Sequence, residues 1–130
     1  MYKIKRKTSS AYNTLWKNFS LYIRLRDAIK TTGTLEYAKC ITCGKILPVS
    51  ELQAGHMIPG RTNGICFDET IVHAQCAKCN GPGGGEKQAY RMKMVAEHGE
   101  GWYAMKEQAR KTPVDLQDLV LREMNKETLS

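Results

Sequence analysis

Four of the five cysteines form two CxxC pairs, and this spacing is the clearest chemical signal in the chain. Two intervening residues let both sulfurs of a pair reach one ion, and four thiolates complete a tetrahedral zinc site with Zn–S distances of about 2.3 Å. Coincidental cysteines or a redox CxxC are the alternatives, but redox motifs rarely come in pairs. We therefore predict a structural Zn²⁺ bound by Cys40, Cys43, Cys76 and Cys79.

Such a zinc ion would close residues 44–75 into a loop with fixed ends. Binding free energy becomes folding free energy where no preformed site exists in the unfolded chain. The loop contains the stretch LQAGHMIPGR, which includes His56. A lone histidine among apolar residues is ordinarily a packed side chain. The zinc ion would present this loop on a rigid base, and the role of His56 stays open on these grounds alone.

Several motifs together resemble one known family. In chain order they are YIRLRDA, CITCGK, LQAGHMIPGR, FDE, VHAQCAKCN and GGGEKQAY, followed by a helical tail. They resemble the phage recombination nuclease family called NinG or Rap, and the two CxxC pairs around a Gly-His element are similar to the zinc-containing branch of the HNH, or ββα-metal, endonucleases. The resemblance extends from about Trp16 through Leu119. It implies an α+β fold, with a small zinc-bound ββα-metal core flanked by N- and C-terminal helices.

The resemblance also implies a catalytic pair. His56 would be the general base that takes a proton from water, and Asn80 would hold a divalent cation, Mg²⁺ or Mn²⁺. A neutral imidazole can activate water near neutral pH, while the cation offsets charge on the scissile phosphate and on the leaving 3′ oxygen. We expect the two side chains to converge on a common phosphate.

One position departs from the general HNH pattern at the metal site. Gly55 precedes the histidine, where many HNH nucleases carry an acidic metal ligand. A carboxylate must then come from elsewhere, or the ion is held more weakly through waters. The candidate carboxylates are Asp68, Glu69 and Glu86, of which the first two fall in the expected second strand.

A second departure concerns the orientation of the base. Ile71 stands where the general pattern has a middle asparagine that orients the histidine. Isoleucine has no side-chain hydrogen bond to offer. Asn63 or the backbone would then orient His56, with His73 as a further auxiliary; alternatively His73 is an ordinary exposed strand residue.

The charge balance suits a polyanionic partner. Lys and Arg number 20 against 13 Asp and Glu. Each phosphate neutralised by a basic side chain releases condensed counterions and adds salt-sensitive affinity. Charge that serves solubility alone is the alternative. The candidate DNA contacts are Arg24, Arg26, Arg61, Lys78, Lys87 and Arg91.

The length of 130 residues fits one domain. We expect a basic N-terminal helix within 1–34, read from Ser10 to Thr31 and closed by Gly33, a zinc-stapled core over 35–85 and C-terminal helices over 86–130. Gly99 and Gly101 are expected to interrupt the C-terminal helices, and the last helix is expected to start at Thr112 as N-cap with Pro113 at its first position. No apolar stretch approaches the ~18 residues that cross a bilayer, and no signal peptide is evident. We therefore expect a cytoplasmic protein of a bacterial host cell, encoded by a phage or prophage. A homodimer would fit a junction cut on both strands.

These expectations combine into a metal-dependent phage or prophage DNA endonuclease that hydrolyses phosphodiester bonds. Branched recombination intermediates are the substrate class that the resemblance suggests. The main alternative is a non-catalytic zinc-ribbon DNA-binding or recombination-accessory protein, and Gly55 and Ile71 favour it. A thiol redox protein is a third alternative, and it requires cysteines that bind no metal.

Overall fold

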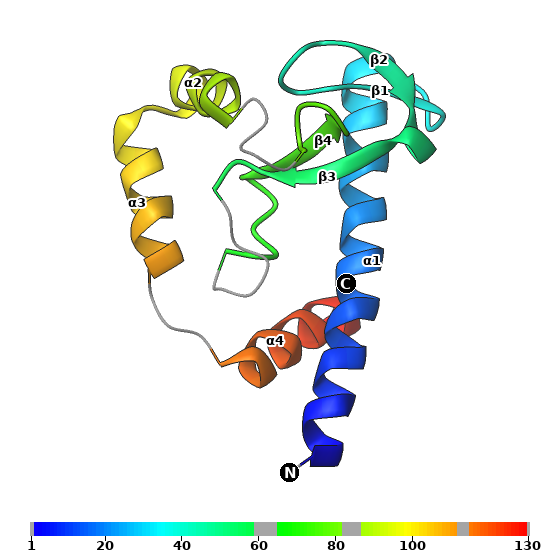
Figure 1. Cartoon of the computed structure of the whole chain (residues 1–130), viewed down its shortest axis with the longest axis vertical. Helices are drawn as coiled ribbons and strands as arrows, with labels where there is room; N and C mark the ends of the chain where they lie inside the picture. Colours follow the sequence, from blue (N-terminus) through cyan, green and yellow to red (C-terminus); the bar gives the residue numbers. More distant parts are fainter. Residues whose placement is uncertain (1, 59–64, 82–86, 112–114, 130) are drawn as a thin grey trace.

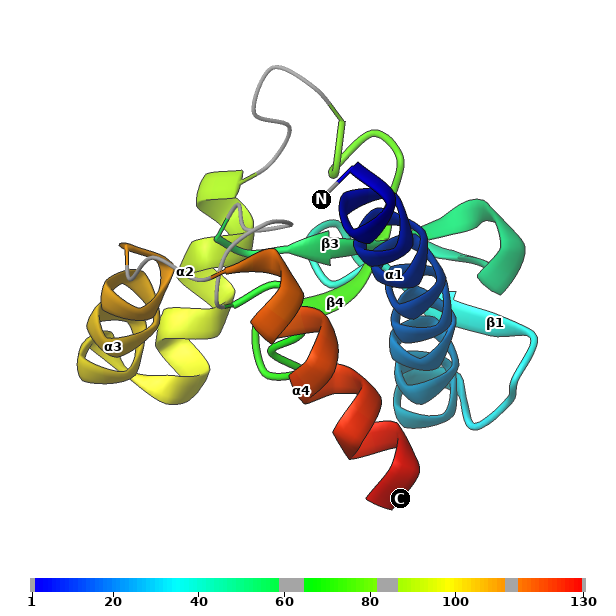
Figure 2. The ribbon, with the colours of Figure 1, turned by 90° about the horizontal axis from the view of Figure 1, so that it is seen from below.

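The computed structural model describes residues 2–58, 65–81, 87–111 and 115–129. Helix α1 (Tyr2–Thr32) runs along the molecule, with two small sheets beside its C-terminal half (Figure 1). Helix α4 (Leu116–Leu129) packs against the N-terminal half of α1, and Figure 2 shows the two helices side by side from below. Helices α2 (Lys87–His98) and α3 (Glu100–Lys111) lie on the other side of the second sheet. The mixture of helices with small sheets confirms the expected α+β class.

Helix α1 is held by buried side chains on two faces. Tyr12, Leu15 and Ile23 recur at helical spacing on one face, and Ala28 is buried on another face in a separate cluster. Gly33 ends the helix with φ +74°, and its N–H donates to the carbonyl of Ile29. Glycine adopts this left-handed conformation without steric cost. The predicted helix and its glycine stop are therefore confirmed.

Two antiparallel sheets follow α1. Strand β1 (Tyr37–Lys39) pairs with β2 (Ile46–Pro48), and a short 3-10 turn, η1 (Val49–Glu51), leads into the second sheet. There β3 (Leu52–His56) pairs with β4 (Val72–Cys76), with Leu52 opposite Cys76 and His56 opposite Val72. The second strand begins after the acidic pair Asp68–Glu69, which lies in a turn and not in the strand as predicted.

The β3–β4 hairpin lies between α1 and α2. Its inward side chains Ala54 and Val72 share a buried cluster with Ile23 of α1 and Tyr90 of α2. The Tyr90 hydroxyl donates to the carbonyls of Gly55 and Ile71, at 2.8 and 3.2 Å. These bonds tie α2 to both arms of the hairpin.

The three C-terminal helices confirm their predicted existence but differ at their starts. Gly99, at φ +95°, separates α2 from α3, whereas Gly101 lies within α3 and does not interrupt it. The predicted cap Thr112 and the following Pro113 lie outside the described residues. Instead, Asp115 accepts hydrogen bonds from two backbone N–H groups of α4, one to its side chain and one to its carbonyl.

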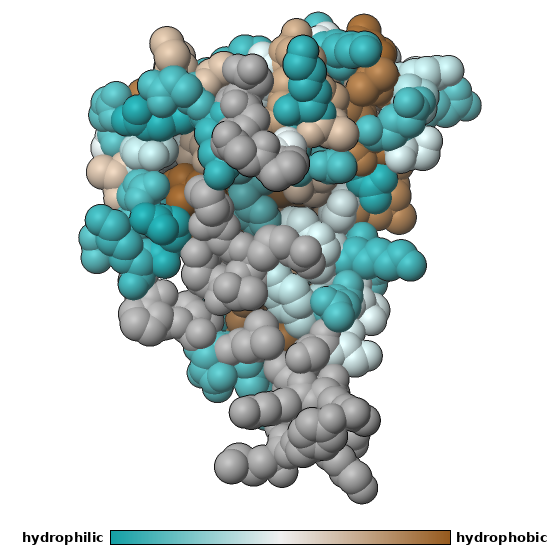
Figure 3. Space-filling model, viewed as in Figure 1, coloured by the Kyte–Doolittle hydropathy of each residue, from teal (hydrophilic) through white to brown (hydrophobic). Residues whose placement is uncertain are grey.

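The surface is polar over α2 and α3 and more apolar at the C-terminal end of α1. Exposed Ile29, Leu35 and Ile46 lie around the β1–β2 ribbon, where Figure 3 shows hydrophobic surface at the upper right. In the part of the chain that the structure describes, no helix combines the length and apolar character needed to span a membrane.

Candidate functional site

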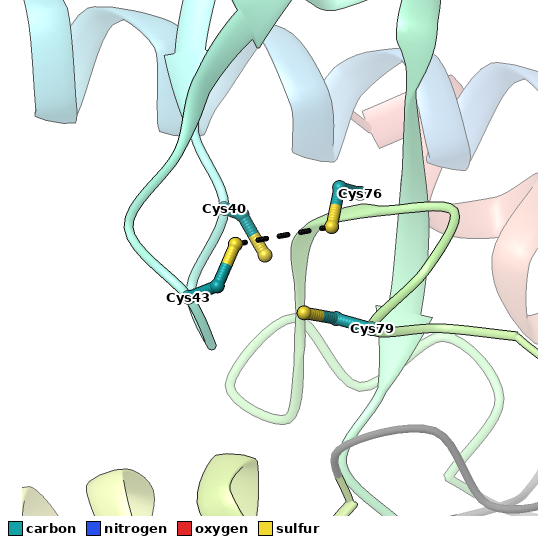
Figure 4. Close-up of side chains that lie close together, drawn as sticks. All are labelled: Cys40, Cys43, Cys76 and Cys79. Carbon is teal, nitrogen blue, oxygen red and sulfur yellow. Dashed lines mark hydrogen bonds between the residues drawn. The ribbon is translucent and has the colours of Figure 1, made fainter.

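The four predicted zinc ligands come together. Their sulfurs all lie within 4.8 Å of one another, and those of Cys43 and Cys76 are 3.9 Å apart (Figure 4). A tetrahedral ion with Zn–S bonds of about 2.3 Å requires sulfurs about 3.8 Å apart. The four thiols are not joined as disulfides. The geometry therefore fits a zinc ion with only small adjustments.

Backbone hydrogen bonds shape the two halves of this cluster in the same way. Gly44 N–H donates to the Cys40 carbonyl, and Asn80 N–H donates to the Cys76 carbonyl, both at 3.0 Å. Gly44 has φ +78°, so the tight turn after the first pair favours glycine there. Both turns direct their cysteine sulfurs toward one point. We call the group formed by Cys40, Cys43, Cys76 and Cys79 the zinc knot.

The electrostatics of the knot favour a bound cation. Burial raises the pKa of the Cys40 thiol, but hydrogen bonds from backbone N–H groups, beginning with that of Cys43, outweigh it and bring the pKa to about 7. Burial and the neighbouring sulfurs raise the pKa of Cys79. The neighbouring sulfurs raise this pKa mainly through hydrogen bonds with the Cys79 thiol and, to a smaller extent, through the negative charge of Cys40; a dication at the centre would stabilise the thiolates.

His56 is the last residue of β3 and lies against α1. Its ring stacks on Trp16 with centroids 5.0 Å apart and planes 13° apart. Its Nε2 lies 2.9 Å from the carbonyl oxygen of Cys66. A carbonyl only accepts, so Nε2 carries the proton and the lone pair resides on Nδ1. The ring is thus held in one orientation and one tautomer.

Asn80 lies directly after the second cysteine pair and approaches β3 from its other face. Its Nδ2 donates to Oε1 of Gln53 at 2.8 Å. Its Oδ1 lies 3.0 Å from the position that a Cβ on Gly55 would occupy. Because side chains alternate along a strand, Gln53 and Gly55 face one side of β3 and His56 faces the other. His56 and Asn80 therefore do not converge on one face, which corrects that expectation.

The predicted carboxylates do not join Asn80. Asp68 forms an ion pair with Lys106 at 2.7 Å and accepts two hydrogen bonds from Thr70. Burial opposes these contacts, yet they lower the pKa of Asp68 overall. Glu69 is exposed in the same turn, and Glu86 lies outside the described residues. Apart from the zinc knot, the described histidines, cysteines and acidic residues form no group of three that could hold a metal.

The predicted auxiliary residues have other surroundings. His73 is half-buried, lies opposite Gly55 and does not contact His56 in the described interactions. Its Nδ1 lies 3.4 Å from a carboxylate oxygen of Asp27, and its Nε2 is buried with no hydrogen-bond partner. Asn63 lies outside the described residues. The backbone carbonyl of Cys66 takes the orienting role, as one of the predicted alternatives allowed.

Arg24 makes structural contacts, and its role as a DNA contact stays a prediction. Its Nε donates to the Ser20 carbonyl, and its guanidinium also donates to the Val49 carbonyl at 3.1 Å. Burial lowers its pKa. The side chain therefore fastens α1 to the turn before β3.

Arg26 also makes contacts inside the protein, and its role as a DNA contact likewise stays a prediction. Its guanidinium donates to the carboxylate of Asp27 at 2.9 Å and to the carbonyls of Glu69 and Val72, both at 2.8 Å. These bonds join α1 to the start of β4.

The remaining basic candidates differ in exposure. Arg91 is half-buried, its guanidinium lies 4.5 Å from the ring centre of Tyr103, and its Nε has no hydrogen-bond partner. Lys78 and Lys87 are exposed, and Lys78 lines a groove of about 640 Å³ beside the zinc knot. Arg61 lies outside the described residues. Of the predicted DNA contacts among the described residues, Lys78 and Lys87 are the exposed ones.

Three site features were not predicted from the sequence. Trp16 was not singled out because its position belongs to an apolar helical stripe. The Cys66 carbonyl is a backbone group without a sequence signal. Gln75 is buried beside Gly55, and strand pairing of residues 53–55 with 73–75 was the signal that could have placed it there.

Comparison with known proteins gives one match. Residues 2–126 match the family described as Bacteriophage Lambda NinG protein. No curated protein matches the chain. No solved structure matches it either. The matched span extends from the start of α1 into α4 and includes the zinc knot, His56 and Asn80.

Proposed function

The chain belongs to the bacteriophage lambda NinG family, whose members are associated with phage recombination, and on this premise we propose that it is a metal-dependent DNA endonuclease. The observation that carries the proposal is the fixed imidazole of His56. A histidine that stacks on Trp16 and donates from Nε2 to a carbonyl keeps its basic nitrogen in a defined place. That is the arrangement a general base requires.

The proton step follows from this tautomer. Nδ1 of His56 takes a proton from a water as the water oxygen attacks phosphorus and the bond to the 3′ oxygen breaks. The imidazolium that forms keeps its Nε2–H bond to the Cys66 carbonyl, at 2.9 Å. An accepting carbonyl stabilises the positive ring, so the contact that orients the base also favours its protonated product.

The opposite placement of His56 and Asn80 fits an in-line displacement. The attacking water and the leaving 3′ oxygen lie on opposite sides of phosphorus in such a reaction. A phosphate across the end of β3 would meet His56 on one side and the oxygen of Asn80 on the other. When bound, Mg²⁺ or Mn²⁺ supplies charge stabilisation of the leaving oxygen. Asn80 would hold that ion on the Gly55 face.

Charge and the zinc knot support DNA as the substrate. The net charge is +7, and the exposed Lys78 and Lys87 flank the segment that carries Asn80. Phosphate contacts position a protein on DNA without reading its sequence. The knot holds residues 40–43 and 76–79 together, so it fixes where Asn80 lies relative to β3. Branched recombination intermediates are the substrate class that we propose.

A plasmid-nicking assay tests the proposal. Zinc-loaded protein is incubated with supercoiled, linear and four-way-junction DNA, with Mn²⁺ or Mg²⁺ added or omitted. Omission is preferable to chelation because a chelator would also remove zinc. We expect nicking that needs the added metal and falls at least about 100-fold in His56→Ala. His98→Ala is the matched control, since His98 stacks on Trp102 at a helix end away from the hairpin.

A DNA-binding protein without catalytic activity is the second candidate. The specific observation behind it is the lack of a carboxylate-containing metal cluster among the described residues. In that case wild type and His56→Ala would bind the junction equally in a gel-shift assay, and neither would nick DNA under any metal condition. Equal binding with nicking lost only in His56→Ala supports the enzyme.

A further inference from the structure

We propose that the buried amide of Gln75 replaces the missing carboxylate at Gly55, so that Gln75 and Asn80 together form the protein's seat for a divalent cation. The inference deepens the proposed function and rests on it for the role of the ion. The binding site itself is argued from geometry. Neither Gly55 nor Gln75 offers a charge, so the site would consist of two neutral amide oxygens.

Gly55 is necessary for this arrangement because its missing side chain makes room for Gln75. A Cβ at this position would overlap Oε1 of Gln75 and lie 2.8 Å from its Cδ. The same Cβ position is 3.0 Å from Oδ1 of Asn80. Both amide oxygens therefore border one small region on the face of β3 that looks away from His56. An aspartate at position 55 would have to displace the Gln75 amide.

The orientation of the Gln75 amide is fixed from its nitrogen side. Its Nε2 donates to Oγ1 of Thr42 at 2.8 Å and points to the carbonyl of Cys79 at 3.5 Å. The residue is 2% exposed. Within the part of the chain that the structure describes, Oε1 of Gln75 accepts no hydrogen bond. This oxygen is not among the fully buried polar atoms that lack a partner, so it retains some solvent contact, and an amide oxygen of this kind can bind a cation.

Asn80 is oriented in the same sense. Its Nδ2 donates to Gln53, which leaves Oδ1 on the Gly55 side. Each of the two amides is also adjacent in sequence to a zinc ligand, Gln75 to Cys76 and Asn80 to Cys79. Four thiolates around one Zn²⁺ carry a net charge of −2, which favours a second cation nearby. The zinc knot thus orients the amides and supplies the negative potential that they lack.

Neutral ligands imply a specific binding behaviour. Mg²⁺ and Mn²⁺ sites normally use carboxylates together with substrate phosphates. With amides alone, the protein binds the ion weakly, and a phosphodiester completes the coordination. The seat is therefore expected to bind metal and phosphate cooperatively, which a carboxylate site would do less strongly.

Mn²⁺ titration followed by NMR tests the inference without using cleavage. Mn²⁺ prefers oxygen ligands, whereas thiolates retain zinc, and its unpaired electrons broaden nearby resonances. In ¹⁵N-labelled zinc-loaded protein we expect the Gly55 amide and the side-chain amides of Gln75 and Asn80 to broaden first. Adding dimethyl phosphate, a phosphodiester mimic, should lower the Mn²⁺ concentration required.

Two variants and one control separate ligand loss from general damage. Gln75→Met removes the oxygen, and Gly55→Ala displaces the amide while keeping both ligand residues. Each should weaken Mn²⁺ binding at least about tenfold with zinc content unchanged. Gln88→Met, on the exposed surface of α2, should leave the titration unchanged. Unchanged Mn²⁺ affinity in both variants, or first broadening elsewhere on the protein, would overturn the inference.

The result is distinguishable from failure of the proposed function. If Mn²⁺ binds at the two amides and the protein does not nick DNA, the cation-binding site is established and the nuclease proposal is refuted. If Gln75→Met nicks DNA with the same Mn²⁺ requirement as wild type, the nuclease proposal stands and this cation site is refuted.

Discussion

Replacement of Asp27 by alanine should destabilise the protein strongly, because this carboxylate joins α1 to β4 inside the molecule. Asp27 is 5% exposed. One oxygen accepts from Nε of Arg26 at 2.9 Å, and the other accepts from the backbone N–H of Ala74 at 2.7 Å. His73 lies 3.4 Å from the second oxygen. The hydrogen bond between Asp27 and Ala74 joins two elements that are far apart in sequence. When the carboxylate is removed, no hydrogen bond within either element replaces it.

The magnitude follows from what the truncation leaves behind. The N–H of Ala74, a fully buried residue, would lose its acceptor, at a cost of about 1–3 kcal/mol. Arg26 would lose its partner charge, but its side chain is 22% exposed and water compensates part of the loss, so we assign it about 1 kcal/mol. The expected loss for Asp27→Ala is therefore roughly 2–4 kcal/mol. Asp27→Asn keeps one acceptor and should lose roughly half as much.

The pKa of Asp27 indicates the sign of the pH dependence. Burial alone would raise it, but the hydrogen bonds from His73, Ala74 and Arg26 hold it below its ordinary value. A carboxyl with a depressed folded-state pKa stabilises the fold above the unfolded-state value, and this contribution is lost as pH falls through the folded-state value. The contribution of Asp27 is thus fully present at neutral pH, where the measurement belongs.

Urea unfolding of zinc-loaded protein, followed by far-UV circular dichroism at fixed zinc concentration, measures the effect. Glu36→Ala, at an exposed position, is the control and should change the free energy of unfolding by less than about 0.5 kcal/mol. The order wild type, Asp27→Asn, Asp27→Ala should appear at constant m-value. An Asp27→Ala protein as stable as the Glu36→Ala control would refute the argument.

Two further predictions concern the zinc knot and the base. Removal of zinc by a chelator should unfold the protein. Structural zinc contributes about 10–16 kcal/mol to folding, whereas a domain of this size is stable by only about 5–15 kcal/mol. A circular dichroism spectrum that does not change when the ion is removed would contradict this prediction. Trp16→Leu should lower kcat for nicking up to about tenfold with little change in KM for DNA, because aromatic contacts contribute about 0.5–1.5 kcal/mol. The control is Trp102→Leu, which removes the similar stack on His98. Equal kcat values in the two variants would contradict the positioning role of Trp16.

The sequence by itself determined the zinc ligands and most helices. Two residues between cysteines fix the reach of both sulfurs, so the pattern at Cys40 and Cys76 predicted a site that the folded chain forms. Helical spacing and a glycine stop likewise predicted α1, because both act within a few residues of the chain. The predicted second strand was placed too early, since the turn that precedes Val72 depends on contacts of Asp68 with distant residues.

The tertiary structure decided which side chains meet around β3. The alternation of faces separated His56 from Asn80, and strand pairing brought Gln75 beside Gly55. Packing against the hairpin directed the guanidinium of Arg26, a predicted DNA contact, to the carbonyls of Glu69 and Val72. These outcomes depend on register and on packing between segments distant in the sequence. Residue types and local spacing do not specify them, because a shift of one residue in register would exchange the two faces.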